Sequence, residues 1–175
     1  ETIMLDTKLY EEQLEKINFQ VNIEEIDGIP TDMAQKIVRT DTNQPLGIVK
    51  SKYKPINHKE AFLGALMQMD KGGVSFKNSE IKIDAYENGA MAKMEVLLKD
   101  HNTKIGEHDL SLKFIARNSY NGRWKFQSFF GWLNHVCFNT LVTGQKLAYT
   151  SNRHTKSFDI SMANNKISNA IEAVT

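Results

Sequence analysis

The sequence is poor in several features that mark particular protein classes. Cysteine occurs once, at Cys137, so no internal disulfide can form. No Asn-x-Ser/Thr tripeptide is present to accept an N-linked sugar. No apolar run approaches the roughly 20 residues of a membrane-spanning helix, and no basic segment followed by an apolar one opens the sequence. These absences predict a soluble, cytoplasmic protein with no membrane partner.

Motifs for nucleotide, metal and cofactor chemistry are missing as well. The chain has no Gly-x-Gly-x-x-Gly, no phosphate-binding loop, no His-Glu-x-x-His and no paired-cysteine zinc site. We therefore expect no bound cofactor. Only three of the 175 residues are proline, 41% are hydrophobic and 25% are charged, which favours one folded domain over residues 1–175 and argues against a disordered or fibrous chain.

Charge is spread unevenly along the chain, although the net charge is only +1. Residues 1–50 contain five Lys or Arg against ten Asp or Glu, whereas residues 101–175 contain nine against four. Residues 111–156 include no acidic residue, but they hold seven basic residues and nine of the sixteen aromatic ones. Such a segment favours an anionic partner, unless the acidic first part of the chain folds against it and neutralises it.

The first part of the chain predicts a helix followed by strands. Residues 6–17 have the apolar spacing of a short amphipathic helix, and residues 19–23 alternate between apolar and polar as a strand does. Two strand-like runs, 34–39 and 46–53, flank a turn that contains Asp, Asn and Pro, and so predict a hairpin.

A second helix and two more hairpins are expected next. Asn57 can cap the helix with Glu60 as its capping-box partner, and the apolar face that follows ends at Gly72. Asn-Gly pairs at Asn88 and Asn121 each lie between strand-like runs and predict two tight antiparallel hairpins. The flanking runs are 80–86, 90–98, 110–120 and 123–130.

The last part of the chain gives weaker patterns. Residues 132–141 fit either a helix or a strand, 146–150 fit a further strand, and 160–173 fit a terminal helix capped by Asp159. All the elements together predict an α+β fold. Its curved antiparallel sheet would be a meander with two tight hairpins, backed by helices on one face.

The second hairpin is the main candidate binding site. Its cations and outer rings are Lys113, Arg117, Tyr120, Arg123, Trp124 and Lys125. Side chains two apart on a strand share a face, so the alternation predicts one basic face and one aromatic face that includes Trp124 and Phe126. An exposed basic face could follow a phosphate backbone while the rings of Tyr120 and Trp124 stack on unpaired bases. The plainer interpretation is an aromatic core and a solvated outer face.

Two further cationic groups extend this candidate surface. Lys50, Lys52 and Lys54 alternate along a predicted strand, so their ammonium groups would share one face. Either a bound phosphate or the protection of a sheet edge against aggregation explains them. Arg153 and Lys156 belong to a polar cluster before the last predicted helix. We include both groups among the candidate nucleic-acid contacts.

Two catalytic alternatives are open at this point. Cys137 with a histidine could form a thiolate nucleophile, although its apolar neighbours favour a buried, inert cysteine. Asp70, Glu80 and Lys82 have the order found in Mg²⁺-dependent nucleases, in which two carboxylates hold the metal and the lysine steadies the attacking water. Glu-x-Lys also occurs on ordinary exposed strands.

Several short blocks resemble one known family. They are Leu46-Gly-Ile-Val-x(3)-Tyr-Lys-Pro within the run 38–62, Val136-Cys-Phe-Asn139 and Arg153-His-Thr155. In this order they resemble the phage- and plasmid-encoded domain of unknown function 932 across roughly residues 30–170. The family usually shows Cys-x-Asn-Gly, where this chain has Thr140 as the last residue. The resemblance implies a viral or mobile-element origin, a setting in which small non-catalytic domains handle single-stranded DNA during replication or recombination.

These observations predict a non-catalytic protein that coats or anneals single-stranded nucleic acid, with DNA as the expected partner. A Mg²⁺-dependent nuclease is one alternative. A virion or assembly protein, whose aromatic face packs against further copies in a homo-oligomer, is another. The main prediction requires the cations to face outward as one track and not to be neutralised by the acidic part of the chain.

Overall fold

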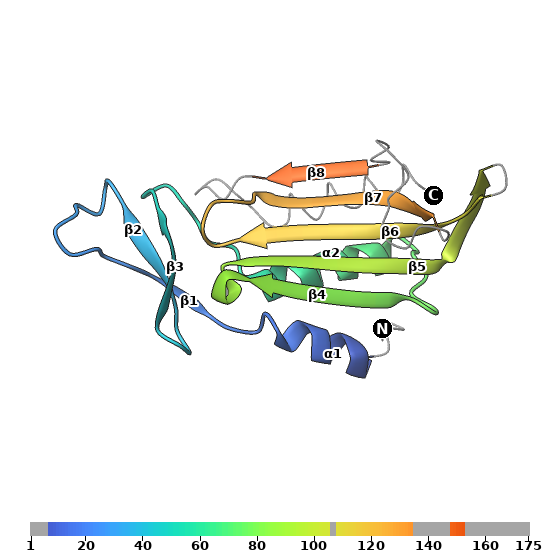
Figure 1. The fold of residues 1–175 in the computed structure, drawn as a ribbon, viewed down its shortest axis with the longest axis horizontal. Coiled ribbons are helices and arrows are strands. Elements are labelled where there is room, and N and C mark those ends of the chain that lie inside the picture. Colours follow the sequence, from blue (N-terminus) through green and yellow to red (C-terminus); the bar gives the residue numbers. More distant parts are fainter. Residues whose placement is uncertain (1–6, 106–107, 135–147, 153–175) are drawn as a thin grey trace.

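A computed structural model describes residues 7–105, 108–134 and 148–152. Within these residues the chain forms two antiparallel sheets and two α-helices (Figure 1). The smaller sheet has the order β1-β2-β3, with bounds Val21–Glu24, Gln35–Arg39 and Gln44–Val49. The larger sheet has the order β4-β5-β6-β7-β8, with bounds Glu80–Tyr86, Met91–Ile105, His108–Ser119, Phe126–Asn134 and Ala148–Asn152. The predicted α+β class is confirmed.

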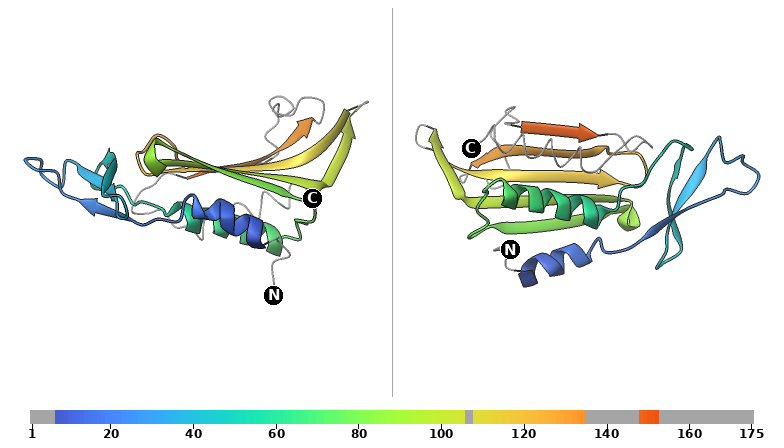
Figure 2. Two further views of the ribbon diagram at one scale, coloured as in Figure 1. Left: turned by 60° about the horizontal axis from the view of Figure 1, so that its bottom comes forward. Right: turned by 180° about the vertical axis from the view of Figure 1, so that it is seen from behind.

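The helix α2, His58–Lys71, begins where the capping residues predicted. The Asn57 side chain accepts a hydrogen bond from the Glu60 N–H at 3.1 Å, which satisfies one of the free donors of the first turn. The helix crosses one face of the larger sheet (Figures 1 and 2). Its buried apolar residues are Ala61, Phe62, Ala65, Leu66 and Met69. Burial of this stripe is the main contribution that α2 makes to the core.

The helix α1, Thr7–Glu15, lies beside the free edge of β4. The Gln13 Oε1 accepts a hydrogen bond from the Ile83 N–H at 3.0 Å, and the Lys16 Nζ donates to the Ile83 carbonyl at 3.2 Å. These side chains satisfy backbone groups that an unpaired edge strand would offer to another chain. In the described part of the chain, no helix has the length and apolarity to cross a membrane.

Two hydrophobic clusters hold the elements together. The larger cluster lies between the helices and the inner face of the larger sheet. The smaller cluster joins the two sheets and consists of Phe19, Ile37, Leu46, Val49, Ala90, Met91 and Tyr120, with Val21, Tyr53 and Trp124 packed against it. The smaller sheet therefore packs against the β6–β7 turn at one end of the larger sheet.

Several predicted details differ in the structure. The strand predicted over 46–53 ends at Val49, and residues 50–53 form a turn in which the Tyr53 N–H donates to the Lys50 carbonyl at 2.9 Å. The two predicted tight hairpins occur, but their loops are longer than two residues, because the last cross-strand pairs are Tyr86 with Met91 and Arg117 with Gln127. The terminal helix predicted over 160–173 lies outside the described residues.

Candidate functional site

The charged face of the larger sheet lies opposite α2. Lys93 and Glu95 on β5 and Lys113 and Arg117 on β6 share this face, because the residues between them are buried in the main cluster. No helix among the described residues covers it (Figure 2). We call it the open face. The predicted shared orientation of Lys113 and Arg117 is confirmed.

Glu95 forms ion pairs with two lysines of the open face. Its carboxylate oxygens lie 3.3 Å from the Lys93 Nζ and 3.5 Å from the Lys113 Nζ. Burial raises the pKa of the Glu95 carboxyl, but the charges of Lys113 and Lys93 outweigh this effect, so the pKa lies below its usual value. The Lys113 side chain is only 14% exposed. Lys113 was predicted to contact a ligand, and this ion pair removes it from the outward track.

Arg117 has a different environment on the same face. It lies opposite Lys93 in the β5–β6 register, and its guanidinium carbon is 5.6 Å from the Trp124 ring centroid and 5.9 Å from that of Phe129. Its Nε is the one buried side-chain nitrogen or oxygen, among the residues that the structure describes, without a hydrogen-bond partner. An unpaired buried donor is unfavourable, so this guanidinium is a good candidate to receive an anion.

Tyr120 is not a stacking residue. Its ring is fully buried and lies 4.1 Å from the His58 ring, between centroids. Its hydroxyl accepts a hydrogen bond from the His58 N–H at 2.9 Å, and burial raises the pKa of the Tyr120 hydroxyl. The prediction that this ring meets a base is therefore wrong, because Tyr120 belongs to the core that joins the two sheets.

Trp124 lies on the cationic side and not with Phe126. The Ser119 Oγ accepts from the Trp124 N–H at 3.0 Å and donates to the Trp124 carbonyl at 2.8 Å, so the strand alternation stops in the turn. Phe126, where β7 begins, is buried in the main cluster, whereas the half-buried Trp124 packs edge-on against Tyr86 with centroids 6.0 Å apart. The prediction that Trp124 and Phe126 share one aromatic face is therefore wrong. The Trp124 indole ring lies beside Arg117 instead.

The two remaining cations of the turn, Arg123 and Lys125, differ in their contact with carboxylates. The Arg123 Nη1 lies 2.7 Å from a Glu87 carboxylate oxygen, in an ion pair whose side chains are 65% and 47% exposed. The side chain of Lys125 is exposed. Of the four predicted hairpin cations, Lys113 and Arg123 are thus paired with carboxylates, so the expected unpaired track is not continuous.

The lysine loop, residues 50–54, lies against the β6–β7 turn. The Tyr53 hydroxyl donates to the Ser119 carbonyl at 2.8 Å, although 66 positions separate the two residues in sequence. Burial raises the pKa of this hydroxyl. The lysines on either side of Tyr53 are exposed, namely Lys50, Lys52 and Lys54. We define the junction surface as these three lysines together with Arg123, Trp124 and Lys125.

A depression of about 400 Å³ adjoins the junction surface. It is lined by Tyr86, Glu87, Met91, Lys93, Arg117, Arg123 and Trp124. Three cations and two aromatic rings thus surround a single carboxylate. Cations beside an exposed ring are the groups that bind a phosphate and a neighbouring base in single-stranded nucleic acid.

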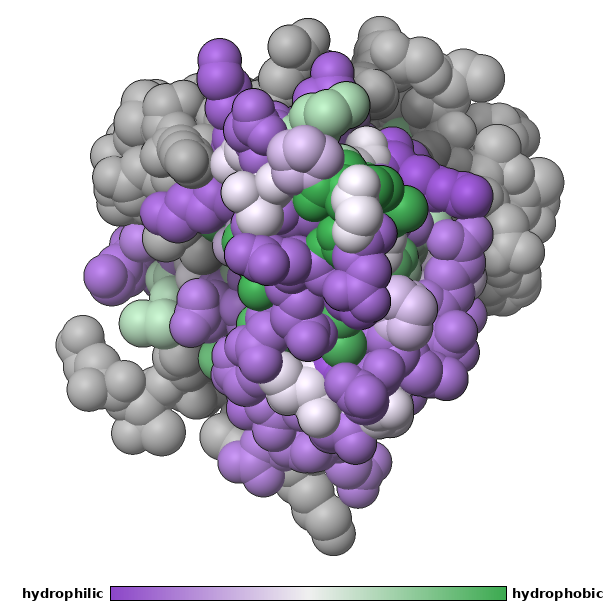
Figure 3. Space-filling view, turned by 90° about the vertical axis from the view of Figure 1, so that its left-hand side faces the viewer, coloured by the Kyte–Doolittle hydropathy of each residue, from purple (hydrophilic) through white to green (hydrophobic). Residues whose placement is uncertain are grey.

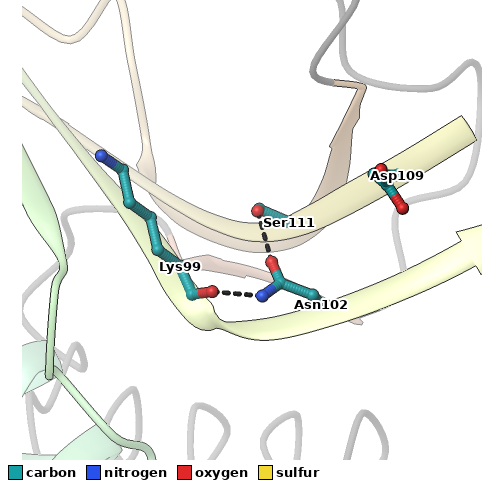
Figure 4. Close-up of a pocket in the computed structure, with 4 residues that line it drawn as sticks. All are labelled: Lys99, Asn102, Asp109 and Ser111. Carbon is teal, nitrogen blue, oxygen red and sulfur yellow. Dashed lines mark hydrogen bonds between the residues drawn. The ribbon is translucent and has the colours of Figure 1, made fainter.

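A second depression, of about 350 Å³, lies between β5 and β6 far from this turn (Figure 4). Asn102 donates to the Lys99 carbonyl and accepts from the Ser111 hydroxyl at 2.6 Å, and Asp109 lines the same space. The bulge between Leu98 and Asn102 shapes it. With one lysine and one aspartate, it has no excess charge of either sign.

The structure also places the residues of the nuclease alternative. Asp70 lies in the last turn of α2, Glu80 pairs with Lys99, and Lys82 lies 3.7 Å from Asp84. The described ranges contain no group of three or more His, Cys, Asp or Glu that could hold a metal ion. Cys137, Arg153 and Lys156 lie outside the described residues.

Sequence reasoning missed three members of the site. Lys93 and Glu95 come to the open face through the β5–β6 register, and Glu87 reaches Arg123 from η1, Glu87–Gly89. Their signal lies in the neighbours that the strand register gives the predicted cations: Lys93 is paired with Arg117, and Glu95 is paired with Ile115, between Lys113 and Arg117. That signal depends on the loop length of each hairpin, which the Asn-Gly pairs alone do not define.

Comparison with known proteins identifies one family. No curated protein and no solved structure matches the chain. A family model described as a domain of unknown function, DUF932, matches residues 45–174, which is more than half of the chain. The matched range includes the lysine loop, α2 and the β6–β7 turn, and therefore both halves of the junction surface. The chain belongs to the DUF932 family.

Proposed function

We propose that this protein binds single-stranded nucleic acid, with DNA as the first candidate, and that it coats or anneals strands without cleaving them. The observation that carries the proposal is the contact between the Tyr53 hydroxyl and the Ser119 carbonyl. It brings a loop with three exposed lysines against a turn that carries Arg123, Trp124 and Lys125. Two cationic segments that are distant in sequence thus form one surface.

The chemistry of this surface fits a flexible polyanion with unpaired bases. Ammonium and guanidinium groups attract phosphates and release counterions, which makes binding sensitive to salt. The half-buried Trp124 offers its ring to a base, and base–aromatic stacking contributes about 1–3 kcal/mol per base with little dependence on sequence. In a duplex the bases are paired and stacked, so we expect single strands to bind more tightly.

The ion pair between Lys113 and Glu95 restricts the path that we propose for the nucleic acid. Lys113 is held by Glu95 inside the open face, so the nucleic acid should follow the junction surface and the adjoining depression and not the full length of β6. The proposed path therefore crosses one end of the larger sheet. This makes the contact short, a few nucleotides per chain.

Fluorescence anisotropy tests the proposal with a labelled oligothymidylate of roughly 20 nucleotides and a duplex of the same length. At about 50 mM salt we expect the protein to bind the single strand more tightly than the duplex, and at about 200 mM salt we expect binding to weaken. Absence of single-strand binding at the lower salt concentration would refute the proposal. Cleavage of the oligonucleotide on addition of Mg²⁺ would instead support the nuclease alternative.

A further inference from the structure

The depression beside the β6–β7 turn contains a carboxylate of the chain itself. The Glu87 Oε1 accepts from the Arg123 Nη1 at 2.7 Å, and the Glu87 Oε2 accepts from the Asn121 Nδ2 at 3.1 Å. A guanidinium and an amide thus converge on one anionic group. The same kinds of donor bind the oxygens of a phosphate.

The backbone at Glu87 has an unusual conformation. Its φ is +51°, in the left-handed region that residues other than Gly, Asn and Asp rarely adopt. The next residue, Asn88, has φ +60°, and its carbonyl accepts a hydrogen bond from the Arg39 Nη1 at 3.0 Å. The turn is therefore held in a conformation that directs Glu87 toward Asn121 and Arg123. Such strain at a binding surface points to a role for the residue that bears it.

Other groups of the depression could bind a second anionic oxygen. The Nε of Arg117 is buried and, within the described residues, has no partner. Lys93 lies opposite Arg117 in the sheet register, and its ammonium group shares the Glu95 carboxylate with Lys113, at 3.3 Å and 3.5 Å. Glu87 is the one carboxylate among the described lining residues. Without it, the depression would be strongly cationic.

We infer that this depression is a phosphate subsite for a nucleic-acid strand, and that Glu87 occupies the position of the phosphate until the strand displaces it. The inference rests on the function proposed above. A phosphodiester that enters takes over the donors of Arg123 and Asn121, and the Arg117 guanidinium adds a further contact. Glu87 is then a built-in competitor that weakens binding to any ligand less anionic than nucleic acid.

The substitution Glu87→Gln tests this competition. The amide keeps the size of the side chain and one acceptor oxygen, so the turn should remain folded, which thermal unfolding checks. We expect affinity for the labelled oligothymidylate to rise about two- to fivefold, the effect of losing one exposed charge contact. The matched control is Glu80→Gln. It removes the same charge from an ion pair with Lys99 at the other end of β4, and we expect no change in affinity.

A double-mutant cycle separates direct competition from long-range charge. Arg123→Gln should weaken binding, and adding Glu87→Gln to that variant should give a smaller gain than in the wild type, because only the Asn121 donor is then left for Glu87 to compete for. An equal gain in both backgrounds would overturn the inference, as would unchanged affinity of Glu87→Gln alone. If the wild-type protein binds the oligonucleotide but the variants give either of these two results, only the role of Glu87 as a competitor is refuted. If the wild type does not bind at low salt, the proposed function falls as well.

Discussion

At the scale of single residues, Gly47 determines how the two sheets meet. A Cβ at this position would lie 2.7 Å from the Asn121 Cα and 3.2 Å from the Tyr120 carbonyl oxygen. Backbone atoms cannot move aside as a flexible side chain can, so only glycine allows β3 to approach the β6–β7 turn this closely. The same approach places the lysine loop beside Arg123 and Lys125. The geometry of the junction surface therefore depends on a residue that carries no charge.

We expect Gly47→Ala to destabilise the protein by about 1–3 kcal/mol, the usual effect of forcing extra atoms into a packed site. Urea unfolding measures the change. The control is Ile48→Thr, next in sequence, which keeps a β-branched residue at a position that is 69% exposed, and for which we expect a change within about 0.5 kcal/mol. Equal stability of Gly47→Ala and wild type would show that the two sheets are not in tight contact at this point.

At the scale of elements, the open face is organised by pairs across neighbouring strands. Glu95 on β5 contacts Lys93 on its own strand and Lys113 on β6. Opposite charges next to each other on one sheet face stabilise the pairing of the strands. The arrangement also explains why Lys113 is a structural cation while Lys125, in the turn, is available to a ligand.

The lowered pKa of Glu95 predicts a pH-dependent contribution to stability. The pKa of this carboxyl is near 4.5 in the unfolded chain and lower in the folded one. The ion pairs of Glu95 therefore contribute fully to stability above the unfolded pKa, and this contribution disappears as the pH falls through the folded pKa. We therefore expect the wild type to be more stable than Glu95→Gln at about pH 7 and this advantage to shrink at about pH 3. Denaturant unfolding at both values measures it, and a difference independent of pH would contradict the ion pairs.

Local signals in the sequence predicted the elements but not every orientation. The capping pair of Asn57 and Glu60 defines the start of α2 because the contact spans only three positions. The lysine loop was predicted as a strand, since alternation cannot reveal that Tyr53 turns toward Ser119 far along the chain. The side on which Trp124 lies depends on hydrogen bonds with Ser119 inside the turn, and strand periodicity carries no information about those.

The candidate site, too, could be predicted from the sequence only in part. The cationic residue types were visible in the sequence, but their neutralising partners Glu87 and Glu95 were not, because strand register and loop length bring them together. The segment without carboxylates was expected to attract an anionic partner, unless the acidic first part of the chain neutralised it. The structure shows that the middle, on β5 and η1, supplies these partners.

At the scale of the whole molecule, the smaller sheet forms an acidic end. Glu24 at the end of β1 and Glu25, Asp27 and Asp32 in the loop that follows are exposed. Viewed from this end, hydrophilic residues dominate the surface around a smaller hydrophobic area (Figure 3). Exposed apolar side chains at this end include Ile48 on β3 and Met33 in the turn before β2. These carboxylates would repel a polyanion, so the path that we propose for the strand follows the junction surface and the depression.

The most direct test of this account is the salt dependence of single-strand binding. Each phosphate contact contributes about 0.7 to the slope of log affinity against log salt for single strands. Replacing two exposed lysines of the junction surface, in Lys52→Gln/Lys125→Gln, should therefore reduce the slope by about 1.4. The control Lys71→Gln/Lys77→Gln removes two exposed lysines near the start of β4 and should leave the slope unchanged. An equal effect of both double variants, or no effect of the first, would contradict the claim that the junction surface binds the phosphate chain.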